Sequence, residues 1–205
     1  MTDTELNAVP ATAEERLKGV KTFFNNGEFF RTHDLALEAL EAFPGDMRFA
    51  HRAVLSLANA GATKLATEKY YEYGLDGSAD IDIRSLLGRL KKDQAFAEFG
   101  DARGTLLREG RAIYENTLRA ATAAHNPEAY YPAINAATLA LLGGDPDAGS
   151  RLAGNVLDIL GPRLAALEAT PPADRYWVLA TALEAHLVRG DVEAALGLID
   201  GVVKE

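Results

Sequence analysis

The sequence predicts an all-α fold, a tandem-repeat α/α solenoid of about five antiparallel helix pairs. Apolar residues recur at helical spacing almost throughout the 205 residues, and no alternating strand pattern lasts long enough to compete. Residues 131–145 also align without a gap on residues 177–191, so that aromatic meets aromatic and both copies end on Gly-Asp. Internal repetition at a spacing of tens of residues is typical of a solenoid, whose units bury their apolar faces against their neighbours.

Turn residues and caps divide the chain into ten predicted helices. Their approximate ranges are 13–25, 28–43, 47–60, 63–73, 80–94, 103–124, 127–142, 146–160, 174–189 and 192–203. Pro44-Gly45 ends the first pair, and Gly74 and Gly77 end the second. Glycine suits these ends because a helix often closes with a residue in the left-handed conformation, where other side chains are strained.

The three later pairs begin at capping residues and prolines. Asp80 is expected to be the N-cap of its helix, because its carboxylate can accept hydrogen bonds from unpaired backbone N–H groups. Pro127 suits the start of the next helix, where its missing N–H leaves nothing unpaired. After the break at Pro171-Pro172, Asp174 is expected to cap the following helix.

The spacing of the turn glycines indicates the repeat type. Gly27 and Gly61 are 34 residues apart, the length of a tetratricopeptide unit, and Pro44 lies where such a unit ends its second helix. Gly144 and Gly190 are 46 residues apart, so the later units are longer. Small residues are expected to let paired helices approach closely at Ala39, Ala66, Ala148 and Ala195.

Two segments are expected to depart from the regular repeat. Residues 1–12 are predicted to be a flexible N-terminus, ahead of a single tetratricopeptide-like domain over residues 13–205. Within that domain, the connection at residues 92–103, with Gly100 and Gly104 nearby, is predicted to be the most irregular segment.

Composition restricts the class of function. A net charge of −9 disfavours binding to duplex nucleic acid or to an anionic membrane, because both depend on Lys and Arg. The absence of cysteine excludes disulfides, thiolate catalysis and cysteine-ligated zinc. The polar start carries no secretory pattern, and no apolar run approaches the ~18 residues that would span a bilayer. These features predict a cytoplasmic protein that does not enter membranes.

The sequence patterns of catalysis and cofactor binding are missing. There is no GxGxxG, no Walker-type GxxxxGK[ST], no HExxH and no G-x-S-x-G elbow. The four histidines fall on different predicted helices, without a second ligand at metal spacing. We therefore expect a protein that is not an enzyme and that holds no metal or cofactor.

The repeated stretch contains two polar trios that mark a candidate binding face. Spacings of four and three residues place each trio on one side of its helix. The trios are Tyr131, Asn135 and Thr138, and Trp177, Thr181 and Glu184. If they lie side by side on the concave face, they offer an aromatic platform and hydrogen-bonding groups to a small planar ligand. The alternative is that the aromatic residues pack between repeats while their polar neighbours face water.

A basic patch lies at the end of the predicted helix 80–94. It consists of Arg84, Arg89, Lys91 and Lys92, followed by Asp93. For Lys91 a structural role is an equal alternative, since a cation near a helix C-terminus offsets the macrodipole by about 0.3–1 kcal/mol. Arg89 and Lys92 are better placed for an anionic ligand, because a guanidinium binds phosphate through two hydrogen bonds.

Three segments stand out in order along the chain: Leu87-Gly-Arg-Leu-Lys-Lys-Asp93, Tyr130-Tyr-Pro-Ala-Ile-Asn-Ala-Ala-Thr138 and Tyr176-Trp-Val-Leu-Ala-Thr-Ala-Leu-Glu-Ala185. They resemble the signature segments of the tetratricopeptide repeats-sensor family, a bacterial relative of the TRAFs-binding central region of apoptosis-signal-regulating kinases. The resemblance covers about residues 50–203. It implies a sensor of a bacterial conflict or signalling system that recognises a nucleotide-derived ligand. Carried over by motif, the polar positions of the family fall on Arg89, Lys92, Asp93, Tyr131, Asn135, Thr138, Trp177, Thr181 and Glu184.

Two functions follow from the sequence and the resemblance. The first is a ligand sensor that controls an effector or signalling protein. This sequence contains no recognisable effector domain, so the effector is expected to be a separate protein or another part of a longer one. The alternative is a protein–protein interaction scaffold whose concave groove binds a peptide or helix of a partner.

Overall fold

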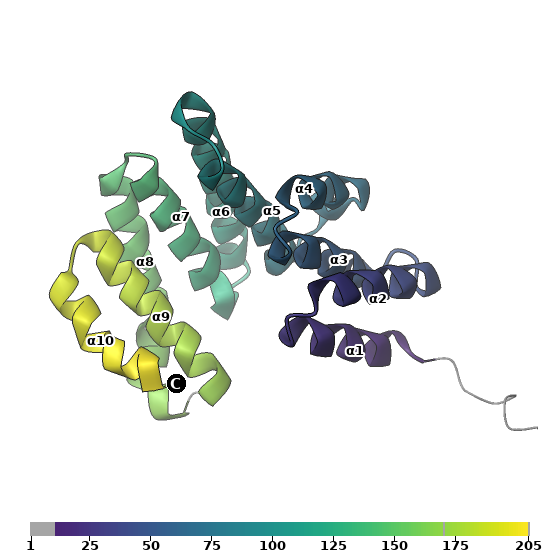
Figure 1. Ribbon diagram of the computed structural model, residues 1–205. Helices are drawn as coiled ribbons and strands as arrows, with labels where there is room; N and C mark the ends of the chain where they lie inside the picture. Colours follow the sequence, from purple (N-terminus) through teal and green to yellow (C-terminus); the bar gives the residue numbers. More distant parts are fainter. Residues whose placement is uncertain (1–10, 170, 205) are drawn as a thin grey trace, which may run out of the picture. The chain divides into compact units, whose positions relative to one another are not determined.

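A computed structural model describes residues 11–169 and 171–204 of the chain (Figure 1). The regular structure of these residues is entirely helical. The helices are α1 (Ala13–Asn25), α2 (Phe29–Ala42), α3 (Met47–Asn59), α4 (Thr63–Glu72), α5 (Ile81–Phe96), α6 (Gly100–Ala123), α7 (Tyr130–Leu142), α8 (Pro146–Ala165), α9 (Pro172–Arg189) and α10 (Val192–Lys204). Among the described residues, no helix combines the length and the hydropathy that crossing a membrane requires. The first ten residues of the predicted flexible N-terminus lie outside the described residues.

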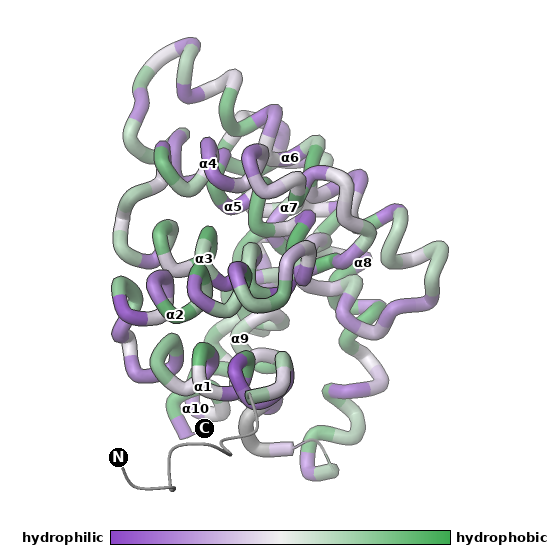
Figure 2. The backbone as a smooth tube through the Cα atoms, turned by 90° about the vertical axis from the view of Figure 1, so that its right-hand side faces the viewer, coloured by the Kyte–Doolittle hydropathy of each residue, from purple (hydrophilic) through white to green (hydrophobic). Residues whose placement is uncertain are grey.

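The chain divides between residues 78 and 79 into two compact units. The prediction of a single repeat domain over residues 13–205 stays a prediction, and each unit is described by itself. Along the helices of both units, hydrophobic and hydrophilic segments alternate (Figure 2), as expected when one side of each helix faces a core.

The first unit consists of α1 to α4. Thr12 begins it with a capping box: the Thr12 hydroxyl accepts a hydrogen bond from the Glu15 backbone N–H, and the Glu15 carboxylate accepts one from the Thr12 backbone N–H at 2.8 Å. Each helix then packs against the next. The core lies among α1, α2 and α3 and consists of Leu17, Val20, Ala36, Ala39, Phe49 and Ala53.

The second unit consists of three helix pairs, α5–α6, α7–α8 and α9–α10. Both α6 and α8 also pack against the following helix, and α7 contacts α5 and α9 directly. The most buried part of the core lies between α7, α8 and α9, where Ala133, Val156, Leu160, Val178 and Ala182 have no exposed surface. The first helices of the three pairs are therefore neighbours.

Glycines let α5 and α6 cross at close range. A Cβ atom on Gly88 would lie 2.7 Å from Cε2 of the Tyr114 ring. A Cβ atom on Gly110 would lie 3.1 Å from Cδ1 of Leu139 and 3.3 Å from the carbonyl oxygen of Gly88. These distances are well inside ordinary carbon contacts of about 3.5–4.0 Å. Neither position has room for a side chain.

The predicted turn glycines and small interface residues are confirmed. The glycines predicted at turns have φ angles of +78°, +81°, +84° and +76°, in the left-handed region that glycine enters freely, at Gly27, Gly61, Gly144 and Gly190. The four small residues predicted at helix contacts are each at most 2% exposed, namely Ala39, Ala66, Ala148 and Ala195.

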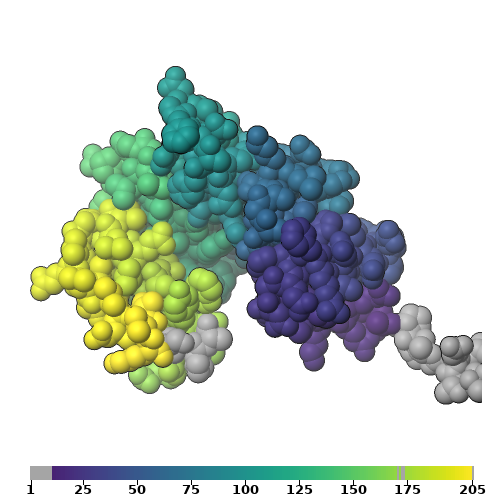
Figure 3. Space-filling view, viewed as in Figure 1, coloured from purple at the N-terminus to yellow at the C-terminus, as the bar shows by residue number. Residues whose placement is uncertain are grey.

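The predicted irregular connection at residues 92–103 is wrong for most of its length. Helix α5 continues to Phe96 and α6 begins at Gly100. Ala95 is fully buried, which holds the last turn of α5 against the core, and Gly100 makes the reversal with a φ of +55°. The resulting short turn stands out beyond the α7–α8 pair (Figure 3), which leaves Phe99 85% exposed.

Two predicted helix starts are also corrected. Asp174 is not the N-cap of α9, because the helix already begins at Pro172, after an N-cap at Pro171. Proline is favoured in the first turn since it has no N–H to leave unpaired, and Asp174 instead places its charge in that turn, where the helix dipole favours it. Pro127 begins a short 3₁₀ turn that leads into α7 at Tyr130.

The N-cap of α5 has a measurable contribution to stability. Oδ1 of Asp80 accepts hydrogen bonds from the backbone N–H groups of Asp82 at 2.8 Å and Ile83 at 3.1 Å. We expect Asp80→Ala to lower the free energy of unfolding by about 1 kcal/mol, measured by urea denaturation with Trp177 fluorescence. Asp80→Asn keeps an acceptor and should retain most of the stability; an equal loss in both variants would contradict the capping role.

Candidate functional site

The nine candidate residues lie on three neighbouring helices of the second unit. Helix α7 contacts both α5 and α9, and the three run beside one another in Figure 1. We call the set the polar strip: Arg89, Lys92 and Asp93 on α5, Tyr131, Asn135 and Thr138 on α7, and Trp177, Thr181 and Glu184 on α9.

Lys92 connects α5 to α7. Its Nζ donates a hydrogen bond to Oδ1 of Asn135 at 2.9 Å, and Nδ2 of Asn135 donates to the carbonyl oxygen of Tyr131 at 3.0 Å. Burial lowers the pKa of Lys92, while the nearby carboxylates of Asp93 and Glu184 act in the opposite direction. The ammonium group is thus partly removed from water and is bound to a neutral amide oxygen.

The two trios meet at one direct contact. Oγ1 of Thr138 donates a hydrogen bond to Oε1 of Glu184 at 2.5 Å. These residues occupy equivalent positions in the repeated stretch, 46 residues apart. Thr181, the middle residue of the second trio, is 9% exposed. The structure therefore brings the trios side by side, with Thr181 more buried than its partners.

The charged residues of α5 divide into two groups. Nε of Arg89 lies 3.5 Å from Oδ2 of Asp93, one turn further along the helix. Lys91 is directed elsewhere, because its Nζ contacts Oε2 of Glu109 on α6 at 2.7 Å. Lys91 therefore ties α5 to α6 and lies outside the polar strip. The macrodipole role expected for it is not borne out, because α5 continues to Phe96 and has no basic residue in its last turn.

The two aromatic residues differ in exposure. Trp177 is 61% exposed and packs edge-to-face on Tyr176, with ring centroids 5.0 Å apart. Tyr131 is 37% exposed as a residue, yet its hydroxyl end lies deep enough for burial to raise the pKa of Tyr131. The interpretation in which Trp177 is packed between repeats does not fit its exposure.

Sequence reasoning missed Tyr114, a fully buried residue of α6. Burial raises the pKa of Tyr114 well above its usual value, and Tyr131 and Asp93 add to the rise. These two neighbours belong to the polar strip. The available signal was Gly88 in the middle of a predicted helix, since an interior glycine points to a close approach by another group.

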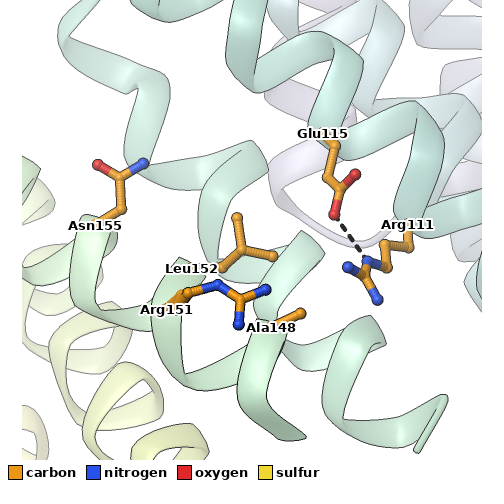
Figure 4. Close-up of a pocket in the computed structure, with 6 residues that line it drawn as sticks. All are labelled: Arg111, Glu115, Ala148, Arg151, Leu152 and Asn155. Atoms are coloured by element: carbon orange, nitrogen blue, oxygen red, sulfur yellow. Dashed lines mark hydrogen bonds and ion pairs between the residues drawn. The ribbon is translucent and has the colours of Figure 1, made fainter. Parts of the chain in front are cut away.

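A separate pocket of about 220 Å³ lies between α6 and α8 (Figure 4). It is lined by Arg111, Glu115, Ala148, Arg151, Leu152 and Asn155. Arg111 is bound on two sides, by Oε1 of Glu115 and Oδ2 of Asp145, each at 2.8 Å. The pair with Glu115 lies within α6, and the pair with Asp145, the N-cap of α8, holds α6 to the start of α8. Within the described part of the chain, no group of three or more His, Asp or Glu residues could hold a metal ion.

Comparisons with known proteins agree with the helix-pair architecture. A family model described as Tetratricopeptide Repeats-Sensor matches residues 32–140, a range that includes the strip residues of α5 and α7 but not those of α9. A thermophilic TPR protein from Thermus thermophilus is similar over 94% of this chain and 91% of its own, with 15% identity and a TM-score of 0.70. A comparison with curated proteins finds no significant match.

Two further solved structures share the fold at low identity. Putative kinesin light chain nearly identical TPR-like repeats from Podosopora anserina align over 96% of both chains, with 12% identity and a TM-score of 0.62. BtubC from P. vanneervenii aligns over 93% of this chain and 78% of its own, with 17% identity and a TM-score of 0.60. At these identities the similarity describes the fold alone.

Proposed function

Because the chain belongs to the Tetratricopeptide Repeats-Sensor family, we propose that it is a sensor whose polar strip binds a nucleotide-derived, anionic small molecule. In this proposal it is not an enzyme, and ligand binding controls a separate effector in a bacterial conflict or signalling system. Its TPR-like fold is that of protein-interaction and regulatory modules. The observation that carries the proposal is the partly buried Lys92 ammonium, bound to a neutral oxygen between two helices.

An anion is the ligand charge that this arrangement favours. The Asn135 oxygen holds the Lys92 ammonium without neutralising it. A phosphate group brings full charge and several acceptor oxygens to the same donor. Arg89, whose Nε contacts Asp93 on its own helix, offers a second and planar donor to such a group. The Lys92 ammonium already makes a charge-assisted hydrogen bond to Asn135, and a phosphate oxygen in place of the amide oxygen adds the attraction between opposite charges, which favours binding.

A planar base is the second part of the proposed ligand. The exposed indole of Trp177 provides a stacking surface, and stacking of a base on an aromatic side chain contributes about 1–3 kcal/mol. Glu184 already accepts a hydrogen bond from Thr138. Its carboxylate can accept others from the hydroxyl or amino groups of a nucleoside.

Trp177 is the single tryptophan of the chain, and its fluorescence provides the test. We expect saturable changes when nucleotides, dinucleotides and cyclic nucleotides are titrated in. At a hundred times the dissociation constant, binding should add about 2.7 kcal/mol of stability, a rise in Tm of about 5–10 °C. Arg89→Ala removes a donor to the phosphate and should abolish the response, whereas Asn155→Ala, in the pocket between α6 and α8, should not. A response to no member of the panel would contradict the sensor proposal.

A protein-binding scaffold is the second candidate function, and exposed aromatic residues of α7 and α9 favour it. Tyr131, Tyr176 and Trp177 are 37%, 41% and 61% exposed as residues, and tryptophan and tyrosine are enriched among residues that dominate protein interfaces. This function predicts no small-molecule response and a partner protein that loses binding to the Trp177→Ala variant. A partner that binds this variant as well as the wild type would assign the interaction to another surface.

A further inference from the structure

Tyr114 reaches the polar strip from the opposite helix of its pair. It belongs to α6 and is fully buried. Its ring lies against the backbone of α5 at Gly88, where a Cβ atom would be 2.7 Å from Cε2 and 2.9 Å from Cζ. The groups that act on the hydroxyl are Tyr131, Asp93 and Arg89, which are all strip residues. The missing side chain at Gly88 therefore lets a second helix deliver a polar atom to the strip.

This hydroxyl makes no hydrogen bond of acceptable geometry with the described residues. The neighbouring hydroxyl of Tyr131 is close enough to raise the pKa of Tyr114. More than about 90% of buried polar groups in proteins are hydrogen-bonded, and leaving one unpaired is unfavourable. Tyr70 shows the ordinary arrangement, because this equally buried tyrosine donates its hydroxyl to the carbonyl oxygen of Leu75 at 3.3 Å.

We propose that Tyr114 forms the floor of the ligand site and that its hydroxyl donates a hydrogen bond to the anionic oxygen bound by Arg89. The inference rests on the proposed function and names a contact that the sequence did not indicate. Burial raises the pKa of Tyr114, so the phenol stays protonated at neutral pH and acts as a donor. A phosphate oxygen accepts such a bond and carries no competing proton. The site should therefore prefer an unprotonated phosphate oxygen at this position.

The first test compares two variants in the absence of any ligand. Tyr114→Phe removes an unpaired hydroxyl, so its Tm should equal or exceed that of the wild type. Tyr70→Phe removes a paired hydroxyl and should lower the Tm by about 2–4 °C. Circular dichroism follows both, since each unit is helical. A fall in Tm for Tyr114→Phe as large as that for Tyr70→Phe would overturn the inference, because the hydroxyl would then be bonded in the free protein.

The second test measures binding of AMP and of inorganic phosphate by calorimetry. Tyr114→Phe should weaken AMP binding by about 10- to 150-fold, the range for a hydrogen bond to a charged group, and Tyr70→Phe should bind as the wild type does. Equal binding by wild type and Tyr114→Phe overturns the role of Tyr114 and leaves the proposed function intact. If the wild type binds neither compound, the result overturns both the proposed hydrogen bond from Tyr114 to a phosphate and the proposal that the ligand is anionic.

Discussion

The Gly88→Ala variant is expected to lose about 1–2 kcal/mol of unfolding free energy and to lose nucleotide binding at the polar strip. The added methyl group would lie 2.7 Å from the ring of Tyr114. That ring is fully buried and has no free space to enter. Overpacking of this kind typically costs about 1–3 kcal/mol, which outweighs the gain of up to about 1 kcal/mol from alanine in a helix. Urea denaturation and AMP titration, both followed through Trp177, measure the two effects.

Gly154 provides the matched control for this variant. It also lies inside a helix, α8, but a Cβ atom there would meet nothing within 4 Å. Gly154→Ala should therefore be neutral or raise stability by up to about 1 kcal/mol, with binding unchanged. When Tyr114 is also replaced by alanine, the methyl group at residue 88 has space. The double variant should therefore lose less stability than the sum of the losses of Gly88→Ala and Tyr114→Ala. Strict additivity would show that the predicted clash with Tyr114 does not occur.

The Lys92→Met variant is expected to lose binding of AMP by at least tenfold while its stability changes little. Methionine removes the charge that holds the phosphate group. The lost hydrogen bond to Asn135 is offset because a desolvated charge is also removed from the folded protein. Lys91→Met is the control. The ammonium group of Lys91 contacts the carboxylate of Glu109 on α6, and a surface ion pair of this kind contributes about 0–1 kcal/mol. Equal losses of affinity in both variants would indicate general electrostatic attraction.

The same variant gives a pH-dependent result with a defined sign. Burial lowers the pKa of Lys92 below its ordinary value of 10.5. Between the folded and the ordinary pKa, the unfolded chain binds more protons, so this residue makes the free energy of unfolding rise with pH in that window. The free energy of unfolding of the wild type, minus that of Lys92→Met, should therefore increase as the pH rises toward 10.5. Stability curves that stay parallel up to that pH would contradict the desolvation of Lys92.

Helix positions could be predicted because their determinants are local. Asp80 accepts its capping hydrogen bonds from residues two and three positions away, and the turn glycines need only their own φ angles. The internal repeat also made one contact between distant residues predictable. Equivalent positions on neighbouring repeat helices lie at the same height, so Thr138 and Glu184 were expected near each other, and they are hydrogen-bonded.

The local predictions failed where a distant contact decides the outcome. Gly100 and Gly104 suggested a long irregular segment, but burial of Ala95 keeps α5 helical up to the turn. The sequence favoured Lys92 for an anionic ligand but left two roles open for the adjacent Lys91. Packing separates them, because Lys91 meets Glu109 on α6 and Lys92 meets Asn135 on α7.

For this chain, local sequence was sufficient for the helices, their pairing and the three helices that carry the polar strip. Periodicity assigns residues to one side of a helix, and cap and turn residues act within a few positions. The contact between Gly88 and Tyr114 depended on tertiary packing. Gly88 and Tyr114 lie on different helices, and they meet because α5 and α6 approach at two glycines. Such a crossing is determined by the shapes of both surfaces together, which neither helix's sequence contains alone.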